Sequence, residues 1–255
     1  MLTKLPRSRL AAYAASKLGA AGVVFLGFLM IMSRFQLYEM WELTRQLRLW
    51  LFIYVYAILF SVAVDVLLRK RKAGSSRTAR IIMLYTLGGY IPFLIWFREE
   101  WIWGLYAGFF GVCCSLTFLC ATRLFRGRWP YSAITAILLL AGAVYVSVTD
   151  FTVTKEWTDR RTTDGYEAEF VYFHGHRTIP VKLEAGQTLS YRIDWQIKHG
   201  GYGTHLDAEG GAYTNVKRDG EGWIAYSVNA PTTVNIVVTG KRAQGALDVR
   251  WNITE

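Results

Sequence analysis

Four histidines are the side chains of this 255-residue chain whose spacing best suits metal chemistry. His174 and His176 lie two residues apart, so they share one face of an extended strand, and they are weak candidates for a zinc or copper site. His199 and His205 flank a glycine-rich segment. No third ligand is fixed near either pair, so surface histidines are the favoured interpretation. We expect neither a metal nor another cofactor.

A second candidate is the glycine-rich segment between His199 and Asn215. It offers the side chains of Tyr202, His205 and Tyr213, with His199 at its start. Aromatic side chains on a glycine-permissive loop suit a sugar, a peptide or a protein partner. A plain hairpin loop is the alternative interpretation.

Covalent catalysis needs a nucleophile, a base and an orienting group. The sequence shows no nucleophile elbow, no S-x-x-K motif and no phosphate-binding glycine loop, so we assign no catalytic residue. Glu99, Glu100 and Asp150 are the polar residues that a membrane enzyme would use near one interface.

The elements that position these residues divide the chain in two. Residues 1–150 hold five apolar blocks long enough to cross a bilayer, which needs roughly 20 residues. These blocks run from about 11–33, 49–68, 81–97, 101–122 and 131–149. The first lacks a small-x-small cleavage pattern, which favours an uncleaved anchor over a signal peptide.

The charges fit this arrangement. Residues 1–150 contain 17 Lys and Arg against 6 Asp and Glu, a net charge of +11, whereas residues 151–255 carry −1. The basic residues concentrate before the first block and in alternate connections. The positive-inside rule therefore predicts a multi-pass plasma-membrane protein with a cytoplasmic N-terminus and an extracytoplasmic C-terminal domain. It also explains the charge without nucleic acid, which we do not expect as a partner.

Small residues mark one stripe of the fourth block, at Gly104, Gly108, Gly111 and Ser115. In lipid, such a stripe permits close helix packing. We favour packing within the chain, and a homo-oligomer through this helix is the alternative.

Three features of the membrane half are open to a simple interpretation. Lys17 is expected to extend its ammonium to the interface. Asp65 is expected to pair with Arg69 one turn away rather than form a functional site. The segment Phe35–Arg48 is either a short amphipathic surface helix or a loop.

The composition changes after Asp150. Residues 151–167 are expected to form a connector. From 168 to 255 the apolar residues alternate with polar ones, most clearly from Leu189 to Ile197, which is typical of half-buried strands. About eight short strands separated by glycine-containing turns predict an antiparallel β-sandwich of the jelly-roll kind. Two such turns are expected at His199–Gly201 and Thr239–Gly240.

A resemblance follows from this rhythm. The segments Val181–Tyr191, Tyr226–Val228, Val234–Gly240 and Gly245–Trp251 resemble those of bacterial pre-peptidase C-terminal domains and GOLD-type domains. The resemblance covers about 80 residues and carries no catalytic motif. It implies a non-catalytic binding or assembly module.

The sequence therefore predicts a membrane-anchored binding protein, which fits a bacterial envelope. Its five-helix bundle acts as an anchor or as a subunit of a membrane complex. Its external domain binds a protein or an envelope glycan. The alternative is a membrane enzyme acting on lipid-linked or cell-wall substrates at the outer interface.

Overall fold

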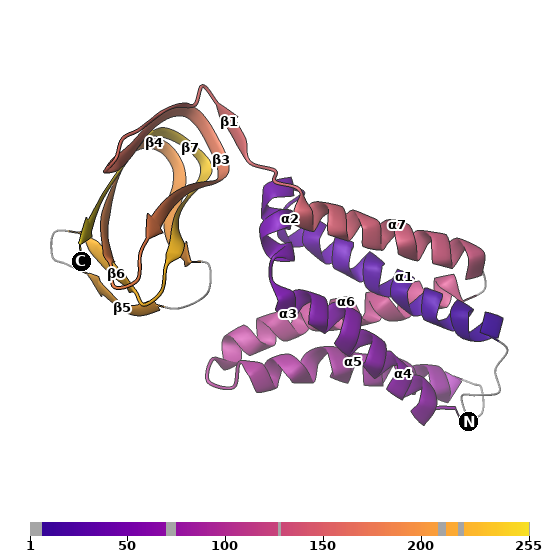
Figure 1. Ribbon diagram of the computed structural model, residues 1–255. Coiled ribbons are helices and arrows are strands. Elements are labelled where there is room, and N and C mark those ends of the chain that lie inside the picture. Colours follow the sequence, from indigo (N-terminus) through magenta and orange to yellow (C-terminus); the bar gives the residue numbers. More distant parts are fainter. Residues whose placement is uncertain (1–6, 70–74, 127–128, 209–212, 219–221, 255) are drawn as a thin grey trace. The chain divides into compact units, whose positions relative to one another are not determined.

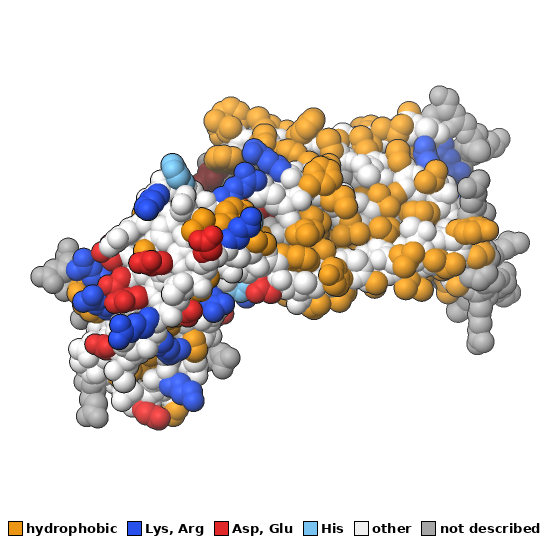
Figure 2. All heavy atoms as spheres, turned by 90° about the horizontal axis from the view of Figure 1, so that it is seen from above, with side chains coloured by type: hydrophobic (Ala, Val, Ile, Leu, Met, Phe, Trp, Pro, Cys, Tyr) orange, Lys and Arg blue, Asp and Glu red, His pale blue; other side chains and the backbone are white. Residues whose placement is uncertain are grey.

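The computed structural model describes residues 7–69, 75–126, 129–208, 213–218 and 222–254. The chain divides into two compact units, and the boundary falls after Asp150, where the composition changes. Unit one is helical and unit two is built of strands (Figure 1). In Figure 2, hydrophobic side chains cover most of the visible helical surface, and charged side chains gather on the β unit.

The helical unit contains the five expected spans. They are α1 (Arg7–Met32), the run α3 (Leu47–Trp50), η2 (Leu51–Tyr56) and α4 (Ala57–Leu67), then α5 (Ser75–Trp96), α6 (Trp101–Phe125) and α7 (Trp129–Val148). Each has a stretch of 19 to 25 residues apolar enough to cross a bilayer. Half of that window is buried in α1, against a third or less in the others, so α1 is the central helix.

The segment Phe35–Arg48, for which a helix and a loop were both open, is mostly helical. Helix α2 (Leu37–Thr44) fills its centre, and α3 begins at Leu47. Arg34 and Phe35 both have positive φ, at 52° and 62°, and they form the sharp turn that ends α1. This turn lets α2 pack against α1 and α7.

Helices α5 and α6 form the closest pair in the bundle. The small-residue stripe of α6 faces α5, as the intramolecular interpretation predicts. The stripe positions Gly104, Gly108, Gly111 and Ser115 meet, in order, Phe97, Tyr90, Gly89 and Tyr85. A Cβ on Gly111 would collide with the Gly89 carbonyl oxygen, so the two backbones touch directly.

Pro92 lies inside α5, which continues past it to Trp96. Proline has no backbone N–H, so the carbonyl four residues earlier, at Gly88, loses its helical donor. The Tyr56 hydroxyl donates a hydrogen bond to that carbonyl at 2.7 Å. A side chain from η2 thus satisfies the backbone group that the proline leaves open.

The second unit is an antiparallel sheet that folds into a sandwich-like domain. Its strands are β1 (Val153–Lys155), β2 (Thr158–Arg161), β3 (Gly165–Leu183), β4 (Thr188–Ala208), β5 (Tyr213–Arg218), β6 (Ile224–Val228) and β7 (Thr232–Thr254). Among the described residues these seven strands follow the order β1-β3-β7-β4-β6-β5, and β2 also pairs with β3. The connector expected at 151–167 is therefore wrong: it contains β1 and β2, and it belongs to this unit.

Three long strands bend together, as Figure 1 shows for β3, β4 and β7. The register shifts lie between Phe170 and Gly175 in β3 and between Ile197 and Gly201 in β4, and both are opposite one stretch of β7. At the bend a Cβ on Gly200 would strike the Arg242 carbonyl, and one on Gly245 the Gln196 carbonyl. Both glycines have positive φ, at 91° and 152°.

The turns expected at His199–Gly201 and Thr239–Gly240 are therefore wrong. The strands continue through both segments, and the glycines permit a bulge and a bend rather than a reversal. The bend divides the sheet into two leaves that enclose one core. Phe170 and Val249 come from one leaf, and Ile179 and Ile236 from the other.

Candidate functional site

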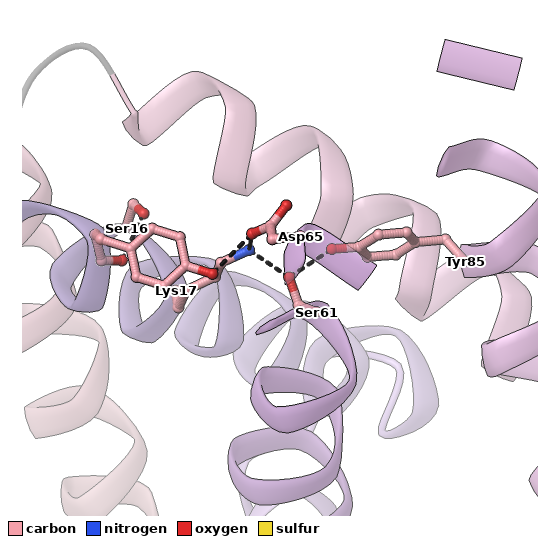
Figure 3. A network of polar contacts seen from close by, with 6 residues as sticks. Ser16, Lys17, Ser61, Asp65 and Tyr85 are labelled. Atoms are coloured by element: carbon pink, nitrogen blue, oxygen red, sulfur yellow. Dashed lines mark hydrogen bonds and ion pairs between the residues drawn. The ribbon is translucent and has the colours of Figure 1, made fainter. Parts of the chain in front are cut away.

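A cluster of polar side chains lies inside the helical bundle (Figure 3). The Lys17 ammonium is 2.8 Å from a carboxylate oxygen of Asp65, and it also donates to the Ser61 hydroxyl. The Tyr13 hydroxyl donates to the same carboxylate oxygen at 2.8 Å. Ser61 in turn shares a hydrogen bond with the Tyr85 hydroxyl. We call Tyr13, Lys17, Ser61, Asp65 and Tyr85 the polar cluster.

This geometry corrects two expectations. Lys17 is 2% exposed, so its ammonium is held in the bundle rather than extended to the interface. Asp65 pairs with this lysine of α1, not with Arg69 of its own chain segment. The sequence does carry a signal for the pairing: Tyr13 and Lys17 are one helical turn apart, and so are Ser61 and Asp65. Each helix thus presents two polar groups on one face.

The polar cluster ties α1, α4 and α5 together. An ammonium in hydrocarbon is unfavourable unless it is paired and hydrogen-bonded. Here Lys17 has a carboxylate and a hydroxyl, and the carboxylate has a second donor. The chain of hydrogen bonds runs from Tyr13 to Tyr85 without leaving the protein.

An apolar cavity of about 420 Å³ lies beside the polar cluster. We call it the bundle cavity, and its walls come from α1, the run α3–η2–α4, α5 and α6. Along α5 its lining runs from Trp96, where the Arg48 guanidinium lies beside the ring, to Tyr85, whose carbonyl accepts a hydrogen bond from Ser115; Gln46 also lines it. Tyr85 therefore belongs both to the cavity wall and to the polar cluster. The cavity depends on side-chain packing among four spans, and the sequence did not predict it.

In the β unit, the expected ligand residues do not form one loop. His199, Tyr202 and His205 lie in β4, which continues to Ala208, so the loop expected from His199 to Asn215 is wrong for this part. The side chain of Tyr213 lies outside the described residues, although its backbone begins β5. Tyr202 and His205 are three residues apart on a strand, and side chains alternate, so they point to opposite faces.

Tyr202 nevertheless has a partner that the sequence did not suggest. Its ring lies 5.0 Å from that of Trp195, and Tyr202 is 57% exposed. The Trp195 indole N–H reaches the Thr204 hydroxyl at 3.4 Å. Trp195 and Tyr202, which we call the aromatic pair, come from the two sides of the bend in β4.

The strand that carries the aromatic pair has one open edge. Strand β6 pairs only with Thr188–Tyr191 of β4. Beyond Tyr191, β7 is the sole strand paired with β4 in the described part of the chain. The residues from Lys198 to Tyr202 are all exposed.

The edge on the other side of the same leaf is protected. Pro180 lies in the half of β3 that neither β1 nor β2 reaches, which agrees with the edge position expected for a proline. Its carbonyl accepts a hydrogen bond from the Arg161 guanidinium at 2.6 Å. Proline and an edge-facing arginine both discourage strand addition. No proline occurs in β4.

The remaining candidates are spread over both units. His174 is buried, whereas His176 is half-buried and its Nδ1 lies 3.3 Å from the Thr152 hydroxyl. Within the described residues, no group of three or more His, Cys, Asp or Glu side chains could hold a metal ion. Glu99 and Glu100 are exposed in the short connection between α5 and α6.

Asp150 is exposed at the end of the helical unit, where it acts on Tyr38 of α2. Burial is the main reason that the pKa of Tyr38 rises to about 12. The negative charges of Glu42 and Asp150 raise it further in the same direction. Asp150, one of the three acids expected for an enzyme, therefore acts on a neutral phenol, and Glu42 belongs to α2.

Comparison with known proteins gives no family. The chain matches no protein-family model, and a search of curated proteins found no significant match.

Proposed function

We propose that this protein is a membrane-anchored binding module whose β domain captures an extended segment of a protein partner. The observation that carries the proposal is the open edge of β4 beside the aromatic pair. An extended peptide adds to such an edge through main-chain hydrogen bonds, and side-chain contacts give it specificity. The exposed ring of Tyr202 supplies an apolar surface for a partner side chain, and the neighbouring Trp195 ring packs partly buried against the β core.

The contrast between the two edges supports this choice. The edge of β3 carries Pro180 and the Arg161 hydrogen bond, which are ways in which proteins block pairing. The edge of β4 has neither a proline nor a strand covering it among the described residues, and its bulge between Ile197 and Gly201 divides the edge into two stretches. The resemblance to pre-peptidase C-terminal and GOLD-type domains favours the same class of function. Other partners, such as an envelope glycan, are less consistent with an open strand edge.

Photocrosslinking from within cells tests this proposal. A benzophenone amino acid replaces Tyr202 in the full chain, and a matched control places it at Lys182, on the protected β3 edge. We expect one dominant protein adduct from position 202, and we expect this adduct to be lost in the Trp195→Ala variant. Mapping of the crosslink should place it in a segment of the partner that binds in extended conformation. Equal adducts at both positions, or none at position 202, would overturn the proposal.

The orientation is the second part of the proposal. The distribution of Lys and Arg between the spans favours a cytoplasmic N-terminus, so the β domain lies on the extracytoplasmic side of a bacterial plasma membrane. All three cysteines lie in α6, so a variant with serine at these positions can carry a single new thiol in the β domain.

Thr204→Cys in that background places the thiol on the open edge. A membrane-impermeant maleimide should label it on cells whose outer membrane alone is permeabilised. A thiol that reacts only after the inner membrane is broken would contradict the orientation.

A further inference from the structure

The walls of the bundle cavity match a hydrocarbon chain. Phe28, Phe52, Phe93 and Phe110 line it together with aliphatic residues and glycines. Its volume of about 420 Å³ falls in the range of roughly 300–1,000 Å³ that is usual for small-molecule sites. Because the bilayer interior is as apolar as these walls, they hold an acyl chain through van der Waals packing, and they offer few groups to orient a polar ligand.

The depth of the cavity matches one leaflet of a bilayer. Along α5 it reaches from Trp96 to Tyr85, eleven residues, which at a rise of about 1.5 Å per residue is roughly 16 Å. The hydrocarbon core of a bilayer is roughly 30 Å thick, so half of it is about 15 Å. The cavity thus begins where α5 ends, at the interface, and stops near the middle of the membrane.

A hollow on the outside of the bundle shares a wall with the bundle cavity. It lies between the run η2–α4 and α5, and it shares Tyr56, Phe60, Gly88 and Trp96 with the bundle cavity. Its other walls include Leu87, Ile91 and Ile95, which are exposed and therefore face lipid in a membrane-spanning helix. Tyr56 and Phe60 both contact Gly88 between the hollow and the cavity, so a hydrocarbon chain that enters from the bilayer at this place displaces these two side chains.

The interface end of the cavity carries a cation. Arg48 and Gln46 both line the cavity. The Arg48 guanidinium lies 5.9 Å from the centre of the Trp96 ring. Arg48 forms no ion pair among the described residues. An arginine at the headgroup level with free donors suits a phosphate, which it can bind through two parallel hydrogen bonds.

We propose that the bundle cavity binds an anionic glycerophospholipid, with one hydrocarbon chain between α1, α5 and α6 and the phosphate at Arg48. Tyr85 closes the far end, so the polar cluster forms the floor of the site. The site is independent of the open edge of β4, and either proposal can fail without the other.

Native mass spectrometry of the full chain tests the proposal. The protein is titrated in mild detergent with phosphatidylglycerol or with phosphatidylcholine of the same chains. We expect one phosphatidylglycerol per chain, bound roughly tenfold more tightly than phosphatidylcholine, because only the first adds net negative charge at the arginine. Arg48→Gln should abolish this preference, and Arg45→Gln, a matched change on the neighbouring turn, should keep it.

Filling the cavity tests the chain-binding part. Cys114 lines the cavity, whereas Cys120 lies on the same helix and is exposed. Cys114→Phe should lose both lipids, and Cys120→Phe should bind as the wild type does. If Cys114→Phe does not fold, the native thiol replaces it as the probe: phosphatidylglycerol should slow maleimide reaction at Cys114 but not at Cys113.

Three results would overturn the proposal. The first is that no phospholipid binds, and the second is that wild type and Arg48→Gln both bind the two lipids with equal affinity. The third is that Cys114→Phe binds lipid as well as Cys120→Phe does and that lipid protects Cys114 no more than Cys113.

Discussion

Replacement of Asp65 by Asn removes the negative charge of the polar cluster and leaves the Lys17 ammonium in place. Lys17 is 2% exposed, so the substitution leaves its ammonium buried without a carboxylate partner. Removing one partner of a buried ion pair costs about 3–5 kcal/mol. Since the Asp65 side chain is 33% exposed, part of its interaction is already weakened by solvent, and we expect the low end, about 3 kcal/mol.

The measurement is thermal unfolding of the full chain in a mild detergent. For a chain of this size, each kcal/mol shifts the midpoint by about 2–4 °C, so Asp65→Asn should lower it by roughly 6–12 °C. Lys17→Met combined with Asp65→Asn should be more stable than Asp65→Asn alone, because the double variant has no unpaired buried charge.

Arg69→Gln is the control, since it changes the partner that helix spacing alone suggests. It should shift the midpoint by no more than an exposed pair would, about 1 kcal/mol or less. The reasoning is refuted if Arg69→Gln is as damaging as Asp65→Asn, or if the double variant is less stable than Asp65→Asn.

Three further predictions concern local contacts. Gly111→Ala should destabilise the bundle by about 2 kcal/mol or more through overpacking, whereas Gly27→Ala, with nothing within 4 Å of the new Cβ, should be neutral or stabilising by up to about 1 kcal/mol in the same melting assay. Tyr56→Phe should cost about 1–3 kcal/mol of stability because the Gly88 carbonyl loses its hydrogen-bond donor. Pro92→Ala restores a helical N–H to that carbonyl, so Tyr56→Phe should cost less in the Pro92→Ala variant than in the wild type. An unchanged cost would contradict the assignment. The pKa of Tyr38 is about 12 in the folded state, against 10 for an ordinary phenol, so its contribution to stability should be complete below pH 10 and lost between pH 10 and 12. Ultraviolet difference titration of the wild type against Tyr38→Phe measures the pH at which this phenol ionises. Ionisation near pH 10 would be inconsistent with its burial.

The sequence predicts the parts of this fold that depend on local pattern. Hydropathy over a single helix length was enough to locate the five spans, because lipid requires a continuous apolar surface. The stripe from Gly104 to Ser115 was visible because small residues at helical spacing have few other uses in lipid. Alternation likewise located the strands that face the β core, such as Leu189–Ile197.

The errors come from interactions between distant segments. The ion pair of Asp65 joins residues 48 apart, and a rule based on helix spacing favours the nearer Arg69. Gly200 looked like a turn residue, yet it allows a neighbouring backbone to approach at a bend. Nothing in a single segment distinguishes these two uses of glycine. The bundle cavity and the aromatic pair were not foreseen for the same reason.

The order of strands also bears on how the β domain is made. β7 follows every other described strand in the chain, yet it lies between β3 and β4 and pairs with both along most of their length. Gly165, for example, pairs with Arg250, which lies 85 residues later in the chain. During synthesis β3 and β4 emerge before the strand that pairs with both, so sheet assembly is slow and late. A chain that stops before Thr232 leaves two strands with unpaired edges, which are prone to aggregate, rather than a smaller domain.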